Sequence, residues 1–128
     1  MFSEDATEKM AILASIIDSS ADAIISKNMD GIITSWNRAS EQMFGYSESE
    51  AVGKHISLII PVDRLSEEEM IISKLRKGER IEHFETIRVT KTGKELVISL
   101  SISPIRNSLG KIIGASKIAR DITKQKEA

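Results

Sequence analysis

Every second residue of the segment Glu95–Pro104 is a large aliphatic residue. These residues are Leu96, Ile98, Leu100 and Ile102, and the positions between them carry Val97, Ser99 and Ser101. Because successive side chains of a β-strand point to opposite faces of a sheet, a period of two predicts a strand with one buried face. A chain with such a strand has to place a second layer of structure over that face.

Turn sequences divide the β-prone parts of the chain into hairpins. The predicted strands are residues 23–26, 32–36, 81–90, 95–104 and 111–119. The turns between consecutive strands contain Asp30-Gly31, Thr92-Gly93 and Leu109-Gly110, and a glycine supplies the left-handed backbone that a tight turn needs. Since a hairpin joins antiparallel neighbours, the sequence predicts an antiparallel sheet.

The segment between the two groups of strands carries signals for several helices. Asn37 can cap a helix over Ala39–Phe44, and Ser47-Glu48-Ser49-Glu50 is a capping box that starts another helix. A short turn is expected at Ser57–Ile60, and a longer helix from Asp63 to Lys77. Helices inserted in this way have to cover one face of the sheet, which predicts an α+β fold.

The longer helix has an apolar side and an acidic run. Its apolar side is formed by Leu65, Ile71, Ile72 and Leu75, and we expect this side to be buried. The acidic run is Glu67-Glu68-Glu69. Adjacent carboxylates on a helix point in different directions, so we interpret the run as a solvated face and not as an acid–base site.

Residues 5–20 predict a helix with an apolar stripe at spacings of three and four residues. The stripe consists of Met10, Ile12, Leu13, Ile16 and Ile17. It can pack on the core of its own domain or form the seam of a dimer, and the sequence leaves both open. We therefore expect a flanking helix at 1–20 that is able to form a dimer contact, a domain at 21–123 and the start of an outgoing helix at 124–128.

Charge and composition narrow the class of protein. The chain has 18 basic and 19 acidic residues, so its net charge of -1 gives no reason to expect a nucleic acid or an anionic membrane as partner. No apolar run approaches the roughly 20 residues that span a bilayer, and no signal peptide is visible, so we expect a cytoplasmic segment that does not insert into a membrane. Cysteine is absent, which excludes disulfides, cysteine–zinc sites and thiol nucleophiles.

The sequence shows no catalytic or metal-binding pattern. His55 and His83 are the only histidines, and neither has neighbours at the spacing of a metal site. We expect a structural or surface role for both, and an exposed position for His83. No nucleophile–base arrangement is present, so this domain alone is not expected to be an enzyme. Trp36 is expected to pack in the core or an interface.

Five motifs, in order, resemble those of the PAS domain family. They are Asp30–Asn37, Ala39–Ser47, Gly53-Lys54 with Ile60-Pro61, Lys91-Thr92-Gly93, and Arg120-Asp121-Ile122-Thr123. The second motif resembles the family's "AAEQMFGYS" helix and turn, the fourth its "KDG" turn, and the last its "RDIT" junction. Each motif is weak alone, but the ordered set covers the chain from about Ile12 to Lys126.

The resemblance implies both a fold and a role. The fold is a five-stranded antiparallel sheet of strand order 2-1-5-4-3, covered on one face by short helices, with 21–123 as the PAS sensor domain. The role is that of a sensor within a larger bacterial or archaeal signalling protein, such as the histidine kinase of a two-component system. A homodimer and a covalently linked effector domain are the partners that this role implies.

The junction formed by Arg120, Asp121 and Thr123 is the predicted signal relay. An Asp between a strand and a helix can accept hydrogen bonds from the free N–H groups of the helix and oppose its dipole. The same bonds would couple the position of the strand to the direction of the outgoing helix. A plain helix cap is the alternative, and the two roles are compatible.

The cofactors of the family can be tested against the sequence. Ile56 lies where the photochemical cysteine of flavin domains would fall, so cysteinyl-flavin chemistry is excluded. Haem is disfavoured because the helix Asp63–Lys77 has no histidine, and Met70 there is more typical of core packing than of ligation. Noncovalent flavin, a small organic ligand and an empty core that only dimerises stay open. The predicted pocket residues are Met43, Leu58, Met70, Leu75, Ile98, Leu100 and Ile102.

Overall fold

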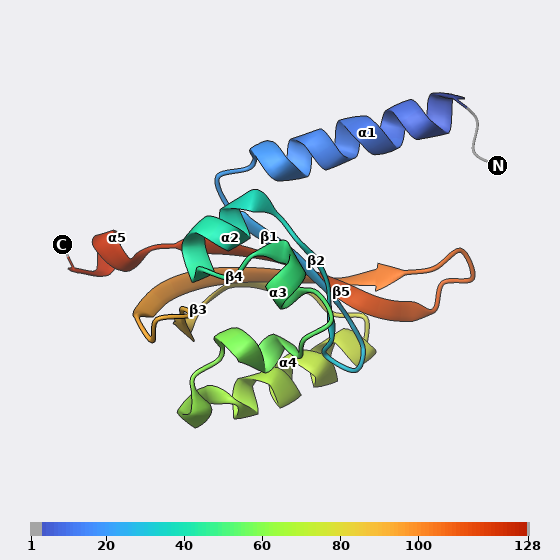
Figure 1. Ribbon diagram of the computed structural model, residues 1–128. Coiled ribbons are helices and arrows are strands. Elements are labelled where there is room, and N and C mark those ends of the chain that lie inside the picture. Colours follow the sequence, from blue (N-terminus) through green and yellow to red (C-terminus); the bar gives the residue numbers. More distant parts are fainter. Residues whose placement is uncertain (1–3, 128) are drawn as a thin grey trace.

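The computed structural model describes residues 4–127, and Figure 1 shows a curved sheet with helices laid over one side. The predictions for residues 1–3, within the flanking helix, and for residue 128, at the end of the outgoing helix, lie outside this range. The strands are β1 (Ala23–Asn28), β2 (Ile33–Trp36), β3 (Ile81–Val89), β4 (Glu95–Arg106) and β5 (Ile112–Asp121). They pair antiparallel in the order β2-β1-β5-β4-β3, which confirms the predicted sheet.

The helical elements lie before, between and after the strands. The α-helices are α1 (Glu4–Ser19), α2 (Arg38–Phe44), α3 (Glu48–Ala51), α4 (Ser66–Arg76) and α5 (Thr123–Glu127). Two 3₁₀ turns, η1 (Ile56–Ile59) and η2 (Val62–Arg64), lie between α3 and α4. In Figure 1, α4 lies below the sheet, whereas α1 extends away from the body of the domain.

The long helix begins later than the sequence predicted. We expected it to start at Asp63, but Val62–Arg64 form the 3₁₀ turn η2 and α4 starts at Ser66. Pro61 precedes this turn, and Leu65, at the N-cap position of α4, makes no side-chain cap hydrogen bond. Short 3₁₀ turns are common where a helix begins, which accounts for the shift of boundary.

The core lies between the helices and the inner face of the sheet. The predicted period of two in β4 is confirmed, because Leu96, Ile98, Leu100 and Ile102 are all buried. Helices contribute Phe44 from α2 and Ile71 and Leu75 from α4 to the same cluster. Burying a large aliphatic side chain contributes about 1.5–3 kcal/mol, so this cluster is the main attachment of the helical layer.

The predictions for Trp36 and Asn37 are confirmed. Trp36 is buried, its ring centroid lies 5.7 Å from that of Phe44, and its Nε1 donates to the carbonyl of Tyr46 over 2.9 Å. Asn37 caps α2 by accepting from the N–H of Ser40 over 3.0 Å. Its Nδ2 also donates to the carbonyl of Ile17, so the same side chain ties the end of α1 to the body.

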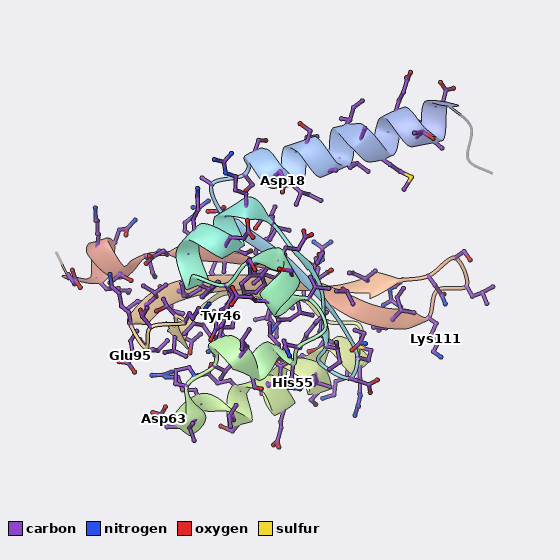
Figure 2. All side chains as sticks on the ribbon, in the orientation of Figure 1. Asp18, Tyr46, His55, Asp63, Glu95 and Lys111 are labelled. Atoms are coloured by element: carbon purple, nitrogen blue, oxygen red, sulfur yellow. The ribbon has the colours of Figure 1, made fainter. Side chains whose placement is uncertain are left out.

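The apolar stripe of α1 faces solvent. Between 40% and 59% of each of its five side chains is exposed, so the interpretation that the stripe packs on its own core is wrong. Figure 2 shows most of α1 standing clear of the sheet, with side chains projecting into open space. Among residues 4–127, no helix is both long enough and apolar enough to cross a bilayer.

Candidate functional site

Three cationic side chains point from the sheet into the covered side of the domain. They are Lys27 on β1, Arg88 on β3 and Lys117 on β5, with exposed fractions of 2%, 1% and 3%. Each occupies an inward position of its strand, in phase with neighbours such as Ile25 and Ala119. A buried charge is costly unless it is paired and hydrogen-bonded, so these residues require partners from the helical layer.

Glu68 of α4 is the partner of both lysines. Its Oε1 is in contact with Nζ of Lys27, and its Oε2 lies 3.2 Å from Nζ of Lys117. Burial, together with the neighbouring charge of Lys117, lowers the pKa of Lys27 from 10.5 to about 6. Burial likewise lowers the pKa of Lys117 to about 7, aided by the charge of Arg88. Both amines therefore lose much of their tendency to hold a proton near neutral pH.

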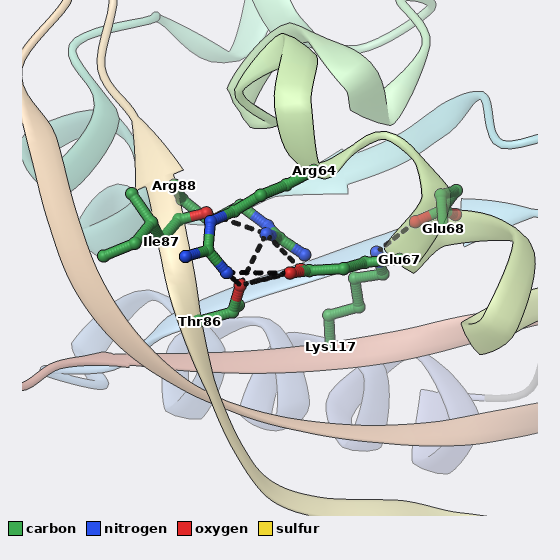
Figure 3. Close-up of polar contacts among 7 residues, drawn as sticks. All are labelled: Arg64, Glu67, Glu68, Thr86, Ile87, Arg88 and Lys117. Atoms are coloured by element: carbon green, nitrogen blue, oxygen red, sulfur yellow. Dashed lines mark hydrogen bonds and ion pairs between the residues drawn. The ribbon is translucent and has the colours of Figure 1, made fainter.

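Glu67, the preceding residue of α4, is held by a second set of donors. Figure 3 shows its carboxylate between Arg64, Thr86 and Arg88. The hydroxyl of Thr86 lies 2.7 and 2.8 Å from the two carboxylate oxygens, Nη1 of Arg88 lies 2.9 Å away, and Nη1 of Arg64 lies 3.0 Å away. Burial alone would raise the pKa of this carboxyl, but the three hydrogen bonds outweigh burial and lower the pKa below its usual value.

The guanidinium of Arg88 is only partly satisfied. Its Nη1 donates to Glu67 and, over 2.8 Å, to the carbonyl of Ile87. Its Nη2 is buried and has no hydrogen-bond partner in the structure. Burial lowers the pKa of Arg88, and the bond to Glu67 opposes this effect. Most buried donors in proteins are paired, so this free N–H group needs an explanation.

The interpretation of Glu67-Glu68-Glu69 as a solvated face is wrong for two of its three residues. Glu68 is buried and Glu67 is half-buried, while Glu69 alone is exposed. The cause lies on the strands, because the cations of the sheet attract the two carboxylates inward. The inward phase of Lys27 and Lys117 in their strands was the signal in the sequence, since a charge on a buried face demands a counter-charge.

The seven predicted pocket residues all belong to the core or pack against it. Leu75, Ile98, Leu100 and Ile102 are buried, and Met43, Leu58 and Met70 are half-buried beside them. Met43 also lines a hollow of about 400 Å³ at the surface. This hollow extends to Leu96 and Asp121, so it lies next to the predicted relay.

The predicted relay residues lie where both flanking helices meet the sheet. Asp121 accepts from the N–H of Thr123 over 3.0 Å and from its hydroxyl over 2.6 Å. The hydroxyl oxygen of Thr123 also accepts from the N–H of Val97 on β4 over 3.0 Å. Arg120 makes a two-pronged contact of 3.2 and 3.1 Å with Asp22, which lies between α1 and β1. The junction thus connects β4, β5 and α5 with the segment between α1 and β1.

The two histidines lie apart from both clusters. His55 caps η1 by accepting from the N–H of Ser57 over 3.1 Å, which confirms a structural role. His83 is exposed, as predicted, and has a φ of 51°. Within the part of the chain that the structure describes, no three His, Asp or Glu side chains gather in a way that could hold a metal ion.

Comparisons with known proteins agree with this geometry. The family model described as the PAS fold matches residues 11–122. The signal transduction histidine-protein kinase AtoS of Escherichia coli K12 is 32% identical over 114 residues, which are 88% of this chain and 18% of AtoS. The sensor protein FixL of Bradyrhizobium diazoefficiens is 36% identical over 64 residues, 50% of this chain and 13% of FixL. The chain therefore spans less than a fifth of either relative.

A solved structure gives the same result for the fold. The PAS domain of a protein from Colwellia psychrerythraea superposes with a TM-score of 0.82 at 30% identity. The match covers 91% of this chain and 98% of that domain, so the two structures correspond over almost their whole length.

Proposed function

This chain belongs to the PAS family, and we propose that it is a sensory module that relays an input from its helical layer to its C-terminal helix α5. The two curated relatives are a signal transduction histidine kinase and a sensor protein, which supports a sensory role. A PAS domain is not itself catalytic, so the output would come from a covalently linked effector such as a histidine kinase. We also propose that this segment of the parent protein lies in the cytoplasm.

The proposed route starts at α4 and follows backbone pairing. Glu67 of α4 bonds to Arg88 of β3, and Arg88 pairs with Leu96 of β4. The next residue, Val97, donates its N–H to Thr123 and accepts from the N–H of Ile122 over 2.9 Å. A displacement of α4 would therefore reach the first turn of α5 through two neighbouring strands.

The observation that carries the proposal is the shared hydroxyl of Thr123. One oxygen accepts from β4 at Val97 and donates to Asp121 at the end of β5. A shift of β4 relative to β5 cannot preserve both bonds, since hydrogen bonds weaken steeply when their length and angle change. The direction of α5 would then depend on the relative position of two strands.

The test uses the regulated output of the parent protein. Thr123→Val removes the hydroxyl and keeps the shape of the side chain, whereas Thr123→Ser keeps the hydroxyl. We expect Thr123→Val and Asp121→Ala to uncouple output from input with the fold intact, and Thr123→Ser to stay regulated. Lys124→Ala, an exposed change on the same helix, is the matched control. Normal regulation in both Thr123→Val and Asp121→Ala would overturn the relay.

A second function, homodimerisation through α1, is favoured by the exposed apolar stripe. An apolar helix face of this kind is typical of an association surface. We expect sedimentation to show a dimer that Leu13→Lys dissociates, while Glu8→Lys at another exposed position of α1 leaves it intact. A monomer at all concentrations would exclude this role and would leave the relay untouched.

As the ligand of the domain we propose a small organic molecule and not haem or flavin. Haem would need an axial ligand, and α4 offers no histidine. The two carboxylates of α4 that face the sheet contact three cationic side chains of the strands. These charged, hydrogen-bonding groups suit a small polar molecule better than a large planar ring. Native mass spectrometry, together with absorbance between roughly 350 and 450 nm where flavin and haem absorb, tests this choice.

A further inference from the structure

Arg64, Thr86 and Arg88 converge on one carboxylate, that of Glu67. We propose that these three residues form a binding site for the carboxylate group of a small organic acid, which Glu67 occupies in the free protein. This inference rests on the proposed sensory function and names the class of ligand that the domain would sense.

The charges and donors of the site exceed what Glu67 can satisfy. Two guanidinium groups and one hydroxyl face a single carboxylate, at distances between 2.7 and 3.0 Å. Arginine is the residue best suited to bind carboxylates, because its planar fork can donate two parallel hydrogen bonds. Two such forks at one point are more than one structural ion pair requires.

The free Nη2 of Arg88 is the independent observation that points to a ligand. Arg88 is 1% exposed, and Glu67 accepts from its Nη1 only. Glu67 is tethered to α4, and in the structure its carboxylate reaches Nη1 and leaves Nη2 without a partner. A free carboxylate has no such tether, so it can accept from Nη1 and Nη2 together and satisfy the buried donor.

The position of Glu67 allows exchange with a ligand. Its side chain is 16% exposed and that of Arg64 is 38% exposed, so the site lies at the rim of the helical layer. Glu68, beside it, remains bound to Lys27 and Lys117. The helix α4 can therefore stay attached through Glu68 while Glu67 turns outward and a ligand takes its place.

A competing internal group has a measurable consequence. The apparent affinity for a ligand falls by the fraction of molecules whose site is free. Removing Glu67 should therefore tighten binding, although it removes a contact of the folded protein. If the ion pair were purely structural, removing Glu67 would destabilise the domain without any gain in ligand binding.

The experiment measures the thermal midpoint of the protein against sodium acetate, with sodium chloride holding the ionic strength constant. We expect acetate to raise the midpoint of Glu67→Ala saturably, and that of the wild type with about tenfold weaker apparent affinity. Glu69→Ala, the exposed neighbour on the same helix, should respond as the wild type does. Should Glu67→Ala not fold without acetate, Glu67→Gln supplies the same comparison with the volume of the side chain preserved.

Two further variants locate the site. Arg64 lies half-exposed at the rim. Adding Arg64→Met to the Glu67→Ala protein should weaken acetate binding about tenfold, the cost of one charge-assisted hydrogen bond. Thr86→Val should weaken it by a similar factor. Binding that is indifferent to both changes would place acetate elsewhere and would overturn the inference.

The remaining outcomes are decisive as well. No saturable effect of acetate on Glu67→Ala and Glu67→Gln would overturn the site, and equal effects of chloride or phosphate would mean an adventitious ion only. Asp121→Ala should bind acetate as the wild type does, since it lies outside the site. If acetate fails to bind while output still depends on the Thr123 hydroxyl, the ligand class is wrong and the relay stands.

Discussion

Helices α1 and α4 depart in opposite ways from the rule that apolar side chains are buried and charged side chains are exposed. The apolar stripe of α1 is exposed, and two of the three adjacent glutamates of α4 are turned toward the sheet. The difference lies in what faces each helix. The sheet presents Lys27, Arg88 and Lys117 to α4, whereas α1 is tied to the body near its C-terminal end through Asn37.

The comparison shows that a helix face is decided by its partner more than by its own composition. Isolated carboxylates favour water, but three buried cations make the interior the better location for Glu67 and Glu68. An apolar stripe favours burial, but α1 can satisfy that preference only against another surface. The following predictions compare the two helices, beginning with the largest expected effect.

Removing Glu68 should produce the largest loss. At or below about pH 6, where the amines of Lys27 and Lys117 hold a proton, Glu68→Ala leaves them buried without a counter-charge, and breaking such a pair typically costs about 3–5 kcal/mol. Urea denaturation measures this loss. The combined variant Lys27→Met/Glu68→Leu/Lys117→Met should be close to neutral or stabilising, because it removes the buried charges together. A loss below about 1 kcal/mol for Glu68→Ala would show that the cluster is hydrated and contributes little.

The buried lysines should also make stability depend on pH. The pKa of Lys27 is about 6 in the folded state and that of Lys117 about 7, against 10.5 for an ordinary lysine. Between these values the unfolded chain binds more protons than the folded one, so the free energy of unfolding rises with pH. We expect stability to increase from about pH 6 toward pH 10 in denaturation experiments. The combined methionine and leucine variant should show a flatter profile, and equal slopes would contradict this assignment.

Loss of the Thr123 hydroxyl should have a smaller effect on stability. Thr123→Val leaves the N–H of Val97 without its acceptor, and a typical protein hydrogen bond contributes about 0.5–1.5 kcal/mol. Chemical denaturation of the isolated domain should show a loss in this range, with Thr123→Ser close to the wild type. An effect as large as that of Glu68→Ala would indicate that the junction supports the fold itself.

Changes in the α1 stripe should have the smallest effect on the fold. Leu13 is 59% exposed, and surface substitutions usually change stability by less than about 0.5 kcal/mol. We expect Leu13→Ser to unfold at the same urea concentration as the wild type when both are dilute and monomeric. A marked destabilisation under these conditions would mean that α1 packs on its own domain.

Much of the fold could be predicted because its signals are local. The alternation in β4, the Asp30-Gly31 turn and the capping box at Ser47 each depend on neighbouring residues and agree with the structure. The start of α4 could not be placed, because the 3₁₀ turn Val62–Arg64 is followed by the helix after one residue, Leu65, and no side-chain cap marks the boundary.

The charged cluster could not be assembled from the sequence because its members are far apart along the chain. Lys27 and Glu68 are 41 positions apart, and Lys117 is 49 positions beyond Glu68. The inward phase of each cation was visible in its strand, but its partner depended on how α4 lies over the sheet. The relay residues were found from a motif, while their bond to Val97 required the pairing of strands.

The most direct test of coupling between α4 and α5 is amide hydrogen exchange at Val97, whose N–H is held by Thr123. It should be measured in Glu67→Ala and in the control Glu69→Ala, with the amide of Ile25 in the sheet reporting any overall loss of stability. We predict that exchange at Val97 accelerates more than at Ile25 in Glu67→Ala alone. Equal acceleration at both amides, or none at Val97, would contradict a route from α4 to α5.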